Sequence, residues 1–291
     1  TRAIGASLRL VVERYDVAGF ALRGVDAQAT LRDGAFVVAT TEATTLDGGP
    51  LVADVRIDLT DLARLPTTAS VGWRGGRLTG GATAGLRYVV PLFAGLDPDT
   101  AGLTGICDVR LALTGPAMPQ DGEGWIAWFD RWRGDGEVGL RDAGFAPAKQ
   151  LQGLLAPLGP LSQGAAPIGK DGRLALDALS APFTFADGFV RTTAGEWLAA
   201  GRKIGLSGSV ALDGSLDYGL DLTALLQGRK DGDRVLQALG GKLPPARLKG
   251  TLDAPALALP ELGNVAQKLL EQQGKDLLKK GLEDLIKKDR K

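Results

Sequence analysis

The residues that most often do chemistry in proteins are scarce in this sequence. It contains no histidine in 291 residues, which excludes a Ser-His-Asp triad, a Cys-His dyad and histidine metal ligands. Cys107 is the one cysteine, so it has no partner for a disulfide or a thiolate zinc cage. It falls on the apolar phase of an alternating segment, where we expect a buried, inert thiol. We therefore predict no catalytic site, no metal site and no cofactor, in a protein that is not an enzyme.

One glycine-rich motif resembles a phosphate-binding loop. Gly134, Gly136 and Gly139 match the G-x-G-x-x-G spacing, which binds dinucleotides when it follows a strand and opens a helix. Here the order is reversed, because a helical pattern precedes the motif and a strand-like alternation follows it. We therefore interpret the motif as a glycine-rich turn.

Acidic residues form no pattern that is typical of a metal or hydrolase site. Asp97 and Asp99, like Asp231 and Asp233, are close in sequence, but neither pair has the full calcium-loop spacing with its closing glutamate. We interpret them as solvated loop charges. A histidine-free enzyme, such as a carbohydrate-active β protein, is one alternative class. It requires a polar cleft with two carboxylates, and no such pair stands out.

Charge and composition indicate a folded protein without a nucleic-acid site. Lys+Arg and Asp+Glu both number 34, whereas nucleic-acid binders carry a basic excess or patch. Hydrophobic residues make up 44% of the chain, too many for a disordered protein. No apolar stretch approaches the roughly 20 residues that span a bilayer. Because the chain begins at Thr1 rather than Met, we expect a segment of a longer protein, with any anchor upstream.

The dominant sequence period is two, which indicates β-strands. Residues 51–59, 107–113, 204–212 and 216–222 alternate apolar side chains with polar or small ones. Asp-Gly pairs such as Asp33-Gly34 recur between these segments and favour tight hairpin turns. One apolar and one polar face is typical of an antiparallel sheet covered on one side. We predict a mainly β protein: a long, curled antiparallel sheet, built as a meander of hairpins, with a few short helices.

Helical patterns are short except at the C-terminus. We expect short helices between strands at four places: 61–66, near 124–133, 147–158 and 232–239. A longer helix is predicted over about 265–288, where leucines recur on one side at helical spacing. The prediction is a sheet domain over residues 1–262 and a C-terminal amphipathic helix within 263–291. That helix would cap the sheet, meet a partner or lie on an anionic membrane surface.

Four aromatic residues form a candidate rim or lid. Trp125, Trp128, Phe129 and Trp132 follow the i, i+3, i+4, i+7 spacing of one helix face. Such a face commonly packs a helix on a sheet. Tryptophan also suits boundaries between apolar and wet surroundings. The alternative is therefore a rim or lid that touches lipid or a partner.

The apolar face of the predicted sheet must be covered. With few helices to cover it, the sheet would close into a barrel, fold as a sandwich, or hold acyl chains in a trough. Each buried methylene of such a chain contributes roughly 0.8 kcal/mol. In a sandwich the inward residues would be core, and in a trough they would line a lipid groove. The candidates are the alternating apolar positions Val55, Ile57, Leu59, Val109, Leu111, Leu113, Phe183, Phe185, Leu206, Val210, Leu212, Tyr218, Leu220 and Leu222.

The pattern as a whole resembles a known family. The alternating run over 204–222 is followed by Gly250-Thr251-Leu252-Asp253-Ala254-Pro255, a G-T-L-x-x-P ending before a terminal helix. Upstream lie the Asp33-Gly34 and Gly48-Gly49 turns and the strand over 51–59. Together these segments resemble the C-terminal part of AsmA-like proteins, whose relatives include TamB and YdbH-type members. The resemblance is one of pattern and covers most of the chain.

The resemblance implies a specific function. AsmA-like proteins belong to the envelope of diderm bacteria and are anchored in the inner membrane by an N-terminal helix. Their long periplasmic sheet curls into a groove for phospholipid acyl chains that travel between the inner and outer membranes. The resemblance thus implies non-enzymatic lipid transport in the periplasm, with an upstream inner-membrane anchor and an outer-membrane protein as partner. The alternative is a structural or adhesive envelope protein with a dry core and no ligand.

Overall fold

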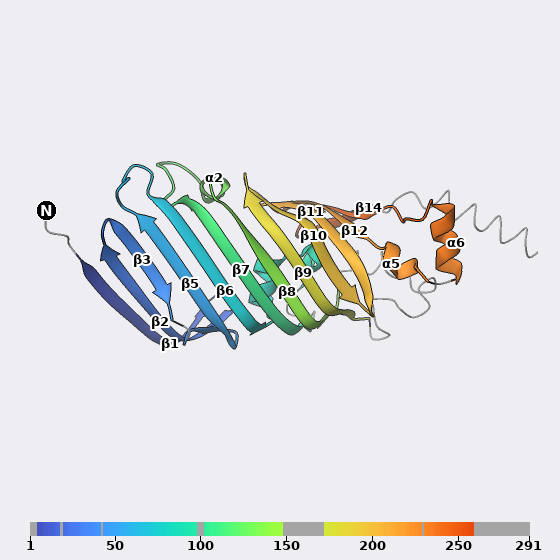
Figure 1. Ribbon diagram of the computed structural model, residues 1–291, viewed down its shortest axis with the longest axis horizontal. Helices are drawn as coiled ribbons and strands as arrows, with labels where there is room; N and C mark the ends of the chain where they lie inside the picture. Colours follow the sequence, from blue (N-terminus) through green and yellow to red (C-terminus); the bar gives the residue numbers. More distant parts are fainter. Residues whose placement is uncertain are drawn as a thin grey trace, which may run out of the picture.

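The described part of the chain forms one antiparallel sheet of 14 strands (Figure 1). This computed structural model describes residues 5–17, 20–41, 43–97, 102–147, 172–228 and 230–258. The strands are β1 (Ala6–Val17), β2 (Phe20–Arg32), β3 (Ala35–Thr40), β4 (Thr45–Leu46), β5 (Gly49–Asp58), β6 (Pro66–Arg77), β7 (Thr104–Pro116), β8 (Arg133–Phe145), β9 (Leu174–Ala186), β10 (Phe189–Ala199), β11 (Arg202–Ala211), β12 (Ser215–Asp221), β13 (Ala246–Thr251) and β14 (Pro255–Ala258). They lie side by side in chain order, except β4, which pairs with β2 and β5. The predicted class, a mainly β meander, is confirmed.

The hairpins turn where the sequence places Asp-Gly pairs. Asp33 and Gly34 have φ of 51° and 72°, and Asp187 and Gly188 have φ of 53° and 71°. Two consecutive residues with positive φ are the requirement of a type I′ turn, whose twist matches the strands that it joins. Local sequence therefore dictates the meander.

The described helices are few and short. They are α1 (Gly80–Leu86), the 3-10 turn η1 (Pro91–Phe93), α2 (Trp125–Asp130), α5 (Thr223–Leu226) and α6 (Lys230–Ala238). The segment α2 lies within the insertion expected near 124–133, and α6 overlaps the one expected at 232–239. Residues 148–158 and the predicted C-terminal helix within 263–291 lie outside the described residues.

The prediction of a helix over 61–66 is wrong. Residues 62–64 form a turn, and strand β6 begins at Pro66. The side chain of Asp61 accepts a hydrogen bond from the Arg64 amide, 3.2 Å away, and Leu65 has a positive φ of 44°. An aspartate bonded to its own following backbone closes a turn instead of propagating a helix.

The glycine-rich motif is not a turn, so that interpretation is corrected. Gly134, Gly136 and Gly139 all lie inside strand β8, which continues to Phe145, whereas a dinucleotide site would open directly into a helix. A Cβ on Gly136 would meet the ring of Phe183 on the neighbouring strand, at 2.5 Å. The glycine leaves room for that ring against the sheet.

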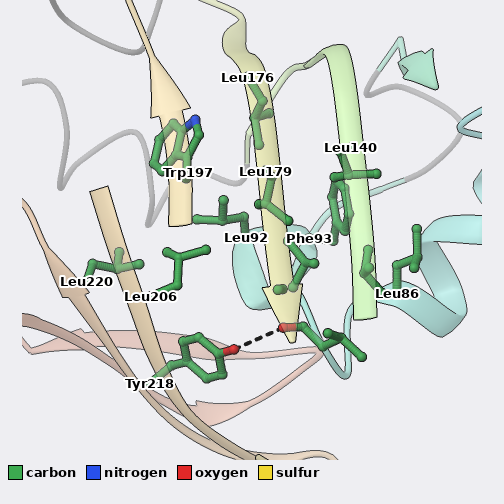
Figure 2. Packing of buried hydrophobic residues seen from close by; sticks show 14 of the residues in the cluster. Leu86, Leu92, Phe93, Leu140, Leu176, Leu179, Trp197, Leu206, Tyr218 and Leu220 are labelled. Carbon is green, nitrogen blue, oxygen red and sulfur yellow. Dashed lines mark hydrogen bonds between the residues drawn. The ribbon is translucent and has the colours of Figure 1, made fainter. Parts of the chain in front are cut away.

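An insert between β6 and β7, residues 78–96, lies on the concave face of the sheet, behind strands β7 to β9 in Figure 1. Its apolar residues, among them Leu86, Leu92 and Phe93, are buried against strands β8 to β13. The rings of Phe93 and Phe145 lie 5.0 Å apart between centroids. Figure 2 shows Leu140, Leu176, Trp197 and Leu206 around the insert. We call the insert together with the inward side chains of β8 to β13 the closed core.

A hydrogen bond joins the insert to β12, a strand near the C-terminal end of the sheet. The hydroxyl of Tyr218 on β12 donates to the Val89 carbonyl across 3.0 Å in a buried setting (Figure 2). Burial raises the pKa of Tyr218 well above its usual range, so this donor keeps its proton at any ordinary pH. The insert and the strands that follow it therefore form one packed unit.

Candidate functional site

An apolar pocket lies where the closed core gives way to the N-terminal strands. Its volume is about 380 Å³, and no charged side chain is found among the residues that line it. The lining comes from the insert, from β2 and β4, from strands β5 to β10, from α2 and from the residue that follows β11. It consists of Phe20, Leu46, Leu51, Val71, Trp73, Ala82, Gly85, Leu86, Tyr88, Val89, Val109, Leu111, Leu113, Phe129, Val138, Phe183, Phe185, Val190 and Leu212.

Strand register places these side chains on one face. Val71 on β6 pairs with Leu111 on β7, Leu111 pairs with Gly136, and Gly136 pairs with Phe183. Residues that oppose each other in an antiparallel ladder point to the same side of the sheet. The alternation of the sequence is thus converted into an apolar surface that runs across the strands.

One row of paired residues crosses eleven strands, from Leu8 on β1 to Leu216 on β12, and leaves out β4. We call it the apolar row. It is, in order, Leu8, Ala29, Val38, Val55, Ala69, Leu113, Gly134, Phe185, Val190, Val210 and Leu216, with Gly250 beyond them on β13.

Burial changes along the apolar row. Leu8 is 68% exposed, the members from Ala29 to Leu113 are half-buried, and Val210 is fully buried. The change falls at the pocket, where the insert begins to cover the face. We call the uncovered part, the half-buried and exposed inward positions of β1 to β7 together with the pocket, the trough.

The predicted groove residues lie in the trough, in the closed core or, like Phe183 and Phe185, at the boundary where the two meet. Val109, Leu111, Leu113, Phe183, Phe185 and Leu212 line the pocket. Val55 and Ile57 lie on the same face of β5 as Leu51 but do not line the pocket, and Leu59 follows that strand, half-buried. The remaining candidates lie in the closed core: Leu206, Val210, Tyr218, Leu220 and Leu222.

Sequence reasoning missed the insert as part of the site. Leu86, Tyr88 and Val89 line the pocket, yet they belong to neither an alternating strand nor a long amphipathic helix. The signal that could have revealed them is the apolar run over residues 88–96, which is too short to span a membrane and too apolar to lie in solvent.

The four aromatic residues of the candidate rim adopt different roles. Trp132 is buried, and the indole N–H of Trp128 donates to the Pro116 carbonyl at 3.0 Å, which fixes α2 to the end of β7. Phe129 faces the pocket. Trp125 at the start of α2 is 69% exposed. The helix thus borders the trough with one aromatic side chain inward and one outward.

Two titratable groups of the described residues, the Cys107 thiol and the Glu137 carboxyl, have shifted pKa values. Burial raises the pKa of the Cys107 thiol to about 12, so it stays protonated and unreactive. Glu137 is held by Arg110 and Ser180, which lower the pKa of its carboxyl. Over the described ranges no three Asp, Glu or Cys side chains gather as a metal site would require. Asp99 lies outside these ranges.

Comparison with known proteins gives no family or function for this chain. No family model, curated protein or solved structure matches this chain. Among the helices that the structure describes, none is long and apolar enough to cross a bilayer.

Proposed function

We propose that this protein binds phospholipid acyl chains in the trough and handles lipid without catalysing a reaction. The observation that carries the proposal is the apolar row, which continues from the buried core into an uncovered face and an open pocket. An apolar surface of this extent on a soluble domain marks a ligand or interaction site. The resemblance to AsmA-like proteins supports the same function.

The energetics favour an acyl chain over water in the pocket. At roughly 0.8 kcal/mol per methylene, ten buried methylenes contribute about 8 kcal/mol, before the cost of ordering the chain is subtracted. The lining has no charged group that a fatty chain would leave unpaired. Branched aliphatic and aromatic side chains are the surface that such a ligand fits.

The closed core supports a trough with one closed end. The insert occupies the concave face over β8 to β13, where an acyl chain would otherwise lie. A lipid would then enter along β1 to β7 or past α2 and stop at Leu86 and Val89. By the same proposal the protein acts in the periplasm, joined to the inner membrane upstream and to an outer-membrane protein beyond.

Organic extraction of the purified protein, followed by lipid mass spectrometry, tests the proposal. We expect stoichiometric phospholipid, and a clear loss of it in Leu111→Asp, because a carboxylate in the pocket repels the apolar chain. The matched control is Val52→Asp, which places the same charge on β5 at an exposed position of the opposite face. Folded protein that yields no lipid would contradict the proposal.

A structural role is the second candidate. The closed core is packed by buried aliphatic and aromatic side chains, as expected for a dry scaffold. On that hypothesis the trough would be covered by another protein and would carry no lipid. The same extraction separates the two, since only the lipid-binding hypothesis expects phospholipid.

A further inference from the structure

Exposed apolar side chains gather at the strand ends where the connection between β7 and β8 forms α2. We call Leu62, Met118, Trp125, Ile126 and Phe129 the rim patch. Trp125 is 69% and Leu62 74% exposed, and the other three are also exposed. Leu62 and Met118 line one hollow with Arg131, the residue that ends α2. The connection between β5 and β6 and helix α2 lie along the same long edge in Figure 1.

The rim patch is continuous with the trough. Phe129 is shared, because it is exposed at the edge and also lines the pocket. Its ring packs on Trp128 with centroids 4.5 Å apart, and Trp128 packs on Trp125 at 5.3 Å. A chain of aromatic contacts therefore leads from the outermost side chain of α2 to the mouth of the trough.

Arginines flank the rim patch. The hollow beside it is lined by Arg56, Arg64, Arg131 and Arg133 against two aspartates, Asp58 and Asp121. Arg131 pairs with Glu123 and Arg133 with Asp187. Arg56 and Arg64 form no salt bridge with any residue that the structure describes. Hydrogen bonds from Thr60 and, to a lesser extent, the charge of Arg56 lower the pKa of Asp58, so Arg56 is partly balanced within the hollow and Arg64 is the freer of the two toward an anionic partner.

We infer that the rim patch docks on an anionic phospholipid bilayer. Tryptophan and aliphatic side chains favour the headgroup boundary of a membrane, and nearby arginines attract lipid phosphates. The inference rests on the proposed function and deepens it: the docked edge is the mouth through which an acyl chain passes from the bilayer, along Phe129, into the trough.

Vesicle co-sedimentation tests the inference with the whole chain. The probes are vesicles of phosphatidylglycerol and phosphatidylcholine in equal parts, and vesicles of phosphatidylcholine alone. We expect binding to the anionic vesicles that is about tenfold weaker in the double variant Trp125→Ser, Ile126→Ser, because both apolar anchors are removed. The double variant Arg56→Gln, Arg64→Gln should lose the preference for anionic vesicles. The matched control, Val52→Ser, removes an exposed apolar side chain from the opposite face of β5 and should bind like the parent protein.

Failure of docking and failure of lipid binding can be told apart. A parent protein that ignores both kinds of vesicle, or a Trp125→Ser, Ile126→Ser variant that binds like the control, overturns the docking inference. Extraction of phospholipid from that same protein would leave the proposed function intact. Vesicle binding by a protein that never contains phospholipid would support docking and contradict the trough as a lipid site.

Discussion

The trough and the closed core share one sheet, one sequence pattern and one register, yet they differ in burial. Val55 and Val210 occupy the same apolar row on β5 and β11, and both alternate with polar or small neighbours. Val210 is fully buried, whereas Val55 is half-buried. The difference comes from the insert over residues 78–96, which covers one half of the face and leaves the other uncovered. An alternating pattern therefore specifies an apolar face, and a distant segment decides whether that face becomes core or binding surface.

The largest contrast is expected from one charge placed in each region. Leu220→Asp puts a carboxylate where the side chain is 1% exposed and lies among the apolar residues of the closed core. We expect a loss of more than about 4 kcal/mol, enough to unfold a marginally stable domain. Leu111→Asp in the trough should fold, because its half-buried carboxylate can reach water. Circular dichroism with chemical denaturation measures both. If both variants unfold, Leu111 is core like Leu220, and the trough is not an open surface.

A second contrast uses glycine. Gly208 on β11 has φ of +151°, and an added Cβ would collide with the backbone of Asp217 and Tyr218. We expect Gly208→Ala to cost about 3 kcal/mol through strain and overpacking. Gly85 in α1 faces the pocket with open space around it, so Gly85→Ala should be neutral or stabilise by up to about 1 kcal/mol. Equal denaturation midpoints would show that the closed core is not tightly packed at Gly208.

Loss of the hydrogen bond between Tyr218 and the Val89 carbonyl should have a smaller effect on stability. Tyr218→Phe removes the donor to the Val89 carbonyl and leaves that acceptor buried without its partner. The expected loss is about 1–2 kcal/mol of unfolding free energy. Tyr15→Phe is the control, because Tyr15 lies exposed on β1. If thermal denaturation cannot distinguish Tyr218→Phe from that control, the hydrogen bond does not hold the insert.

The smallest effect is expected at the surface end of the insert. Arg87 pairs with Asp253 at 2.7 Å, and the aspartate side chain is 83% exposed. Exposed ion pairs contribute about 0–1 kcal/mol, so Asp253→Asn should shift stability by no more than about 0.5 kcal/mol. A larger loss, measured in low salt and abolished in high salt, would mean that charge rather than apolar packing holds the insert in place.

Local signals made the sheet predictable, and non-local contacts limited the rest. Asp33-Gly34 and Asp187-Gly188 specify their own turns through positive φ, so the meander follows from neighbouring residues. The hydrogen bond between Tyr218 and Val89 joins positions 129 residues apart. Nothing in either segment alone indicates that one covers the other. For the same reason Gly136 resembled a turn residue, because its contact with Phe183 lies on another strand.

The most direct test of the account is substituted-cysteine labelling on the two halves of the apolar row. Cys107 is buried and the pKa of its thiol is raised, so we expect a maleimide not to label the unsubstituted protein. We expect Leu113→Cys to react in delipidated protein and to be protected once phospholipid is restored, because Leu113 lines the pocket. Val210→Cys should resist labelling in both states. Equal rates at the two positions, or no protection of Leu113→Cys by phospholipid, would contradict an open lipid trough beside a closed core.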